Sequence, residues 1–135
     1  MKTFMYAFVK GTDKAVPFYQ KAFDTTIEYE DVDLKEDGTY WHVLLKFNNQ
    51  MLGLSELSED NMDSVGSEKI TGNVMQFCLL FDADEEDKLR NAYEVLKEDA
   101  DVRTPLGPME YAYLICDLID KYGIRWCMAI ENKNK

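Results

Sequence analysis

The side chain best suited to acid–base chemistry is the single histidine of the sequence, His42. It lies in "TYWHVLLKFN", residues 39–48, whose β-branched and aromatic residues predict a strand. Because side chains alternate along a strand, His42 should share one face with Leu44 and Lys46. A neutral imidazole on a cleft-facing strand could act as a general base near pH 7. A hydrogen-bonded structural histidine is the alternative, and the sequence favours it.

Cys127 is the thiol whose sequence neighbours best suit a nucleophile. Such a cysteine needs a nearby cation or helix N-terminus to lower its pKa, and Arg125 precedes it by two residues in the predicted strand 123–131. A buried cysteine that packs as a small hydrophobe is the more common case, and we expect it here. Cys78 and Cys116 have no basic neighbour in the sequence and are predicted to lie in the core. Three cysteines without a CxxC pair indicate reduced thiols and a cytoplasmic location.

The sequence also supplies enough rings to line a pocket. The candidate aromatic side chains are Tyr6, Phe8, Tyr40, Trp41, Phe77, Tyr111, Tyr113 and Trp126. The polar groups that could accompany them are His42, Glu56, Gln76 and Asp117. Apolar walls with a few polar groups are typical of small-molecule sites. The same rings could instead fill a core or a dimer interface.

Two parts of the chain predict the same order of elements. The first part predicts a strand at 3–9, a helix capped by Thr12 or Asp13 and ending near Phe23, and strands at 25–34, 39–48 and 50–56. About 70 residues later the order recurs, with a strand at 73–82, a helix at 84–99, and strands near 100–104, 111–119 and 123–131. We expect a single α+β domain spanning 1–135. It would comprise βαβββ modules at 1–56 and 73–131, joined by a linker at 57–72 and forming a curved mixed β-sheet with a pseudo-twofold cleft.

The charge of the chain excludes one class of partners. Its 135 residues include 26 acidic and 15 basic side chains, for a net charge of −11. Proteins that bind phosphate backbones need a surplus of Lys and Arg, so we expect neither nucleic acid nor an anionic membrane as a partner. No apolar run approaches the roughly 20 residues of a membrane-spanning helix.

Four segments, in order along the chain, resemble a known superfamily. They are "FYQKAF" at 18–23, "WHVLL" at 41–45, "PLGP" at 105–108 and "DKYGIRW" at 120–126. With the repeated βαβββ pattern, they resemble the vicinal oxygen chelate superfamily, which includes glyoxalase I, bleomycin-resistance proteins and extradiol dioxygenases. Within it they are most similar to the PhnB-like branch. We therefore expect a homodimer of this fold.

The resemblance also implies a divalent metal held by His and carboxylate ligands from four strands. The first strand offers Tyr6 and its neighbours instead of His, and the fourth offers Glu56 only at its end. Gln76 falls at the fifth-strand position and Cys127 at the eighth-strand position. This set is too poor in hard donors, so we expect no metal and no cofactor.

Two functions stay open at this stage. The first is metal-free binding of a small apolar or aromatic molecule in an aromatic-lined cleft. The residues expected to bind it are Tyr40, His42, Gln76, Tyr111, Trp126 and Cys127. The alternative is a lyase, isomerase or oxygenase that uses His42 and Glu56, which requires both side chains to reach one cavity. The sequence leaves enzymatic activity undecided.

Overall fold

The computed structural model describes residues 1, 3–29, 32–57 and 75–132. The chain divides into two compact units, Met1–Ile70 and Thr71–Lys135. Of the predicted linker at 57–72, all but the first residue lies outside the described residues. No helix in the described part of the chain is long and apolar enough to cross a membrane.

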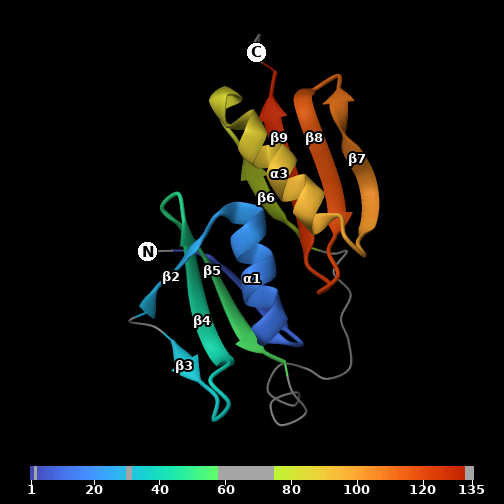
Figure 1. Ribbon diagram of the computed structural model, residues 1–135. Helices are drawn as coiled ribbons and strands as arrows, with labels where there is room; N and C mark the ends of the chain where they lie inside the picture. The colour runs from blue at the N-terminus through green and yellow to red at the C-terminus, as the bar shows by residue number, and fades with distance from the viewer. Residues whose placement is uncertain (2, 30–31, 58–74, 133–135) are drawn as a thin grey trace. The chain divides into compact units, whose positions relative to one another are not determined.

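The first unit has the predicted βαβββ order (Figure 1). Its elements are β1 (Met5–Val9), α1 (Thr12–Phe23), β2 (Thr26–Ile27), β3 (Asp33–Leu34), β4 (Tyr40–Phe47) and β5 (Gln50–Glu56). The strand order is β1-β5-β4-β2, with β3 also paired to β4. Strand β1 runs parallel to β5, whereas β2, β3 and β5 run antiparallel to β4. The single strand predicted at 25–34 is therefore corrected to two strands of two residues each.

The second unit repeats this topology (Figure 1). Its elements are β6 (Phe77–Leu80), the 3₁₀ turn η2 (Ala83–Glu85), α3 (Glu86–Leu96), β7 (Asp101–Met109), β8 (Ala112–Ile119) and β9 (Arg125–Glu131). The strand order is β6-β9-β8-β7, again with the first strand parallel to the last. The α+β class and the duplicated module are thus confirmed. Strand β7 is longer than predicted, because an edge strand with bulged pairing tolerates Pro105 and Pro108.

Each helix packs on one face of its own sheet and leaves the other face open. Helix α1 contacts β4 and β5 and buries Val16, Tyr19 and Ala22, which lie three residues apart and so share one face of the helix. Its start differs from the prediction, because Gly11, in a left-handed conformation with φ 93°, takes the N-cap position and Thr12 is already helical. Helix α3 contacts β9 and buries Leu89, Ala92, Val95 and Leu96. The helix-covered faces form the core of each unit and place the remaining strand side chains on the open faces.

Candidate functional site

The polar centre of the first unit's open face is the phenol of Tyr6. Its hydroxyl lies 2.7 Å from Nδ1 of His42 and is also hydrogen-bonded to Oγ of Ser55. The strand register explains this contact, because His42 is paired with Ser55 and Tyr6 is paired with Gly53 in the same strand β5. Residues paired directly across neighbouring strands point to the same face. Three strands therefore bring a phenol, an imidazole and a hydroxyl together.

Gly53 provides the room in which the Tyr6 ring lies. A Cβ atom at Gly53 would be 2.5 Å from Cδ2 of Tyr6 and 3.0 Å from Cδ2 of Leu44. The Tyr6 ring thus lies directly over the backbone of β5, where only a glycine fits. It stacks on the His42 ring with 5.7 Å between centroids and 18° between planes. Gly53 therefore fixes the direction of the Tyr6 hydroxyl.

A row of exposed rings flanks this polar centre. Phe4 and Phe8 lie on either side of Tyr6 along the chain, with ring centroids 6.2 Å and 5.5 Å from it. Their exposed fractions are 42% and 45%, which is high for phenylalanine. We call Phe4, Tyr6, Phe8, His42 and Ser55 the open aromatic face. Its rings can stack on a planar molecule, and its polar centre can hydrogen-bond to that molecule.

The three polar groups also form a path for a proton. With Nδ1 of His42 unprotonated, Tyr6 donates to His42 and accepts from Ser55. Such a path can deliver a proton to a bound molecule or remove one from it. The geometry alone assigns no reaction.

Glu56 lies on the opposite face of the sheet from His42. It follows Ser55 in β5, so its side chain points toward helix α1. Its carboxylate accepts hydrogen bonds from the backbone N–H groups of Gly11 (2.7 Å) and Thr12 (3.0 Å), and from the Thr12 hydroxyl (3.1 Å). The Lys35 ammonium lies 2.9 Å from the same carboxylate. Glu56 thus caps the start of α1 and lies on the opposite face from His42, whereas the alternative acid–base hypothesis requires both side chains to reach one cavity.

The electrostatics of Glu56 agree with a structural role. Burial by itself would raise the pKa of its carboxyl. The hydrogen bonds from Gly11, Lys35 and Thr12 outweigh burial and lower that pKa below its ordinary value. Glu56 is therefore held as a carboxylate and is poorly suited to donate a proton near neutral pH.

Trp126 belongs to the core of the second unit, so its predicted role in ligand binding is corrected. Its exposed fraction is 0%, and its ring packs against Phe77 with centroids 5.4 Å apart. Its indole N–H donates to the buried Asp120 at 2.9 Å. The other oxygen of Asp120 accepts from the backbone N–H groups of Tyr122 and Ile124. Trp126 and Asp120 together fix the turn between β8 and β9.

Cys127 lies on the open face of the second unit but lacks the surroundings of a nucleophile. Burial and a hydrogen bond with Cys78 raise its pKa to about 12. Arg125 does not activate it as considered from the sequence, because the guanidinium forms a bidentate pair with Asp117 at 3.0 Å and 2.6 Å. Cys116 is buried as predicted, and desolvation raises its pKa to about 11. Cys78, in contrast, is exposed, so its predicted core position is wrong.

The other predicted binding residues are scattered. Tyr40 begins β4 and shares a strand face with His42 by alternation. Gln76 is exposed and directly precedes β6, and Tyr111 is exposed in the turn between β7 and β8. The predictions missed the Tyr6–His42–Ser55 contact and the room that Gly53 provides. Strand alternation predicts which side chains share the face of His42 in its own strand. Only the pairing register of β1, β4 and β5 shows which residues of the neighbouring strands contact His42 on that face.

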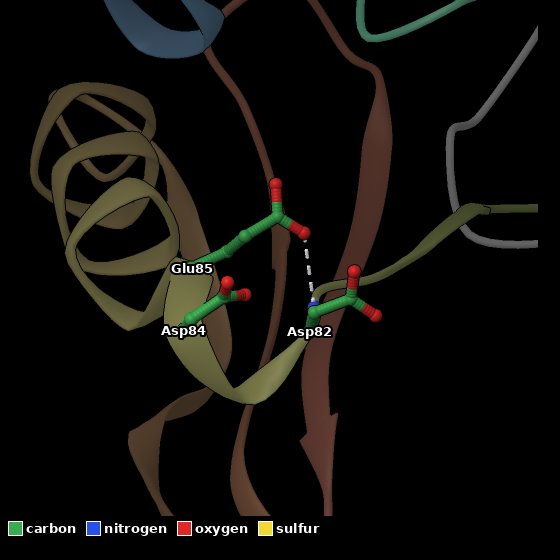
Figure 2. A group of neighbouring side chains, drawn as sticks. All are labelled: Asp82, Asp84 and Glu85. Atoms are coloured by element: carbon green, nitrogen blue, oxygen red, sulfur yellow. Dashed lines mark hydrogen bonds between the residues drawn. The ribbon is translucent and has the colours of Figure 1, made fainter.

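The donors expected at the superfamily's metal positions do not suit a hard divalent ion. The Glu56 carboxylate is bound to the start of α1, Gln76 precedes strand β6, and Cys127 offers a soft thiol instead of an oxygen or nitrogen donor. Among the described residues, one group of at least three acidic, His or Cys side chains is close enough to hold an ion: Asp82, Asp84 and Glu85. Figure 2 shows Glu85 reaching back to the backbone nitrogen of Asp82, at 3.0 Å. This is a capping box at the start of η2, so the local fold explains the acidic group.

Comparisons with known proteins show the fold. No protein-family model matches the sequence, and no curated protein matches it. Among solved structures, the PhnB protein of Bacillus cereus is similar with a TM-score of 0.73 and 18% identity, covering 96% of this chain and 99% of that one. A glyoxalase/bleomycin resistance protein/dioxygenase family enzyme from Burkholderia phytofirmans PsJN has a TM-score of 0.66 and 15% identity, covering 96% and 97%. The fosfomycin resistance protein FosX of Listeria monocytogenes has a TM-score of 0.68 and 10% identity, covering 98% and 94%. The chain therefore shares the fold of these three solved structures, which is the fold that the resemblance predicted.

Proposed function

We propose that this protein binds a small molecule with a planar apolar part and one hydrogen-bonding group on its open aromatic face. The observation that carries the proposal is the hydroxyl of Tyr6, which joins His42 and Ser55 between two exposed phenylalanine rings. Exposed rings beside a fixed polar group favour binding over simple core packing. Because the net charge of the chain is −11, a neutral ligand is favoured over an anionic one.

The structural neighbours agree with a small-molecule function without specifying a ligand. The FosX protein is named for fosfomycin resistance, and the Burkholderia protein is named as a glyoxalase/bleomycin resistance protein/dioxygenase family enzyme. Their identity to this chain is at most 15%, so neither ligand nor reaction passes to it. The homodimer expected from the resemblance stays a prediction, which multi-angle light scattering measures directly.

Phenol and toluene are suitable probes because they share a ring and differ in one hydroxyl. We expect phenol to shift the NMR signals of the open aromatic face and to bind more tightly than toluene. A single hydrogen bond contributes about 0.5–1.5 kcal/mol, which corresponds to a difference of about 2- to 10-fold. Tyr6→Phe should remove this difference, because it deletes the hydroxyl and keeps the ring.

Tyr29→Phe is the matched control, since Tyr29 is an exposed tyrosine of the same unit outside the open aromatic face. It should bind phenol as the unmodified protein does. The proposal fails if phenol, up to its solubility, shifts no signal of Tyr6, His42 or Ser55. It also fails if Tyr6→Phe and Tyr29→Phe bind phenol equally well.

A further inference from the structure

Two thiols lie side by side on the open face of the second unit. Cys78 in β6 and Cys127 in β9 are direct register partners in neighbouring parallel strands. Both are free cysteines, and their direct pairing places the two side chains next to each other on one face of the sheet. Cys78 is exposed and Cys127 is half-buried, so the pair is accessible from the open face. None of the roles described so far uses these two sulfur atoms together.

The geometry of the sheet suits a bridging ion better than a disulfide. Neighbouring strands lie about 4.7–4.9 Å apart, and directly paired side chains stand roughly parallel. A disulfide needs its two Cβ atoms about 3.8 Å apart, which is about one ångström closer than this spacing. A zinc–thiolate bond is about 2.3 Å long, so two sulfur atoms bridged linearly by an ion of similar size would lie about 4.6 Å apart. Two-coordinate binding therefore fits the spacing of β6 and β9.

The neighbours of the two thiols select the type of ion. Leu80 and Ala129 follow the two thiols on this face along β6 and β9 and are apolar, whereas Arg125 precedes Cys127 on the same face. Asp117, the register partner of Cys127 in β8, is held by Arg125 in a bidentate pair. A hard ion such as Mg²⁺ would find too few oxygen donors beside the thiols. Two thiolates with few oxygen donors beside them suit a soft ion such as Cu(I) or Zn²⁺, and a site with two ligands favours Cu(I), because structural zinc sites are almost always four-coordinate.

We propose that Cys78 and Cys127 form a two-coordinate site for Cu(I). On binding, each thiol loses its proton to solvent and donates a sulfur lone pair, so one Cu(I) and two thiols give one anionic bis-thiolate complex and two protons. Copper stays in the +1 state and no electron is transferred. The site lies within one unit and does not depend on the open aromatic face.

The test uses the whole reduced chain under nitrogen, titrated with Cu(I) in competition with a colorimetric Cu(I) chelator. We expect one Cu(I) per chain, X-ray absorption showing two sulfur ligands, and release of two protons per ion. Losing a partner that only supports a metal ligand costs 10–100-fold in affinity. Cys78→Ser and Cys127→Ser, which each remove a ligand, should therefore weaken binding by about 100-fold or more.

Cys116→Ser is the matched control, because Cys116 is buried in the neighbouring strand β8 and faces helix α3. It should bind Cu(I) like the unmodified chain. Alkylating the exposed Cys78 of the unmodified protein with iodoacetamide should abolish binding and needs no variant to fold. Unchanged affinity in Cys78→Ser or Cys127→Ser, or one Cu(I) shared by two chains, would overturn the proposal.

Discussion

Replacing Glu56 tests whether this residue holds the fold together or takes part in chemistry. Its carboxylate contacts include two backbone N–H groups at the start of α1, the Thr12 hydroxyl and the Lys35 ammonium. Glu56→Ala removes these acceptor contacts at once. It leaves the open aromatic face unchanged, because Glu56 points to the opposite face of the sheet.

The expected loss follows from the cost of each contact. Removing a helix N-cap costs about 0.5–2 kcal/mol. Breaking a buried ion pair costs about 3–5 kcal/mol, but the Lys35 side chain is 24% exposed and recovers part of its hydration. We therefore expect Glu56→Ala to lower the free energy of unfolding by about 2–4 kcal/mol. Lys35→Met should cost less, about 0.5–1 kcal/mol, because Glu56 keeps its other donors.

Urea unfolding followed by circular dichroism measures these changes. Glu131→Ala is the control, since Glu131 is the exposed last residue of β9 as Glu56 is the buried last residue of β5. We expect Glu131→Ala to change stability by less than about 0.5 kcal/mol. Equal losses in the two variants would refute the capping role. Loss of phenol binding in a folded Glu56→Gln protein would refute the separation of Glu56 from the open aromatic face.

The pH dependence gives an independent check on the same carboxylate. The pKa of Glu56 in the folded state is lowered from its ordinary value of 4.5. The charged form is therefore favoured by folding, and its stabilisation is present above pH 4.5 and is lost as the pH falls through the lowered pKa. The stability difference between the unmodified protein and Glu56→Gln should shrink as the pH falls below that value. If this stability difference stays constant until Glu56 is fully protonated, the lowered pKa of Glu56 is contradicted.

Three further changes probe the two units. Gly53→Ala should displace the Tyr6 ring and lower the free energy of unfolding by about 1–3 kcal/mol, because the added methyl group overpacks the site. Unchanged stability with an unshifted NMR signal of the Tyr6 ring would contradict the close approach of Tyr6 to Gly53. Trp126→Phe should lower the free energy of unfolding in urea by about 1–3 kcal/mol, because the buried Asp120 loses a hydrogen-bond donor. Unchanged stability would show that water replaces the indole N–H. Cys116, with its pKa raised to about 11, should resist iodoacetamide at pH 8 in the native protein and react after unfolding, as mass spectrometry would record.

The sequence predicted the elements well because their periodic signals are local. Alternation in β4 placed His42, Leu44 and Lys46 on one face, as the register confirms. Apolar residues three or four apart, such as Val16, Tyr19 and Ala22 in α1 and Leu89, Ala92 and Leu96 in α3, indicate both helices, and these residues are buried in the structure. The single strand predicted at 25–34 is wrong because the described residues of this stretch pair with β4 in two short segments, which local composition does not show.

The site was harder to predict because its contacts join distant segments. Tyr6 and His42 are 36 residues apart, and Tyr6 and Ser55 are 49 apart. Gly53 carries no signal of its own until the parallel pairing of β1 with β5 places the Tyr6 ring over it. Glu56 was a candidate catalytic acid because the sequence around it does not show that helix α1 begins against the end of strand β5.

Duplication explains how one topology can support two different kinds of surface. In both units the first strand pairs in parallel with the last strand of the unit. On the open face of each unit, a side chain of the first strand lies against its register partner in the last strand. In the first unit that contact pairs Tyr6 with Gly53, so a ring crosses the backbone and reaches a histidine. In the second unit it pairs Cys78 with Cys127, so two sulfur atoms meet. The backbone pairing is conserved between the units while the side chains on it differ, so each open face can acquire its own chemistry without changing the core behind it.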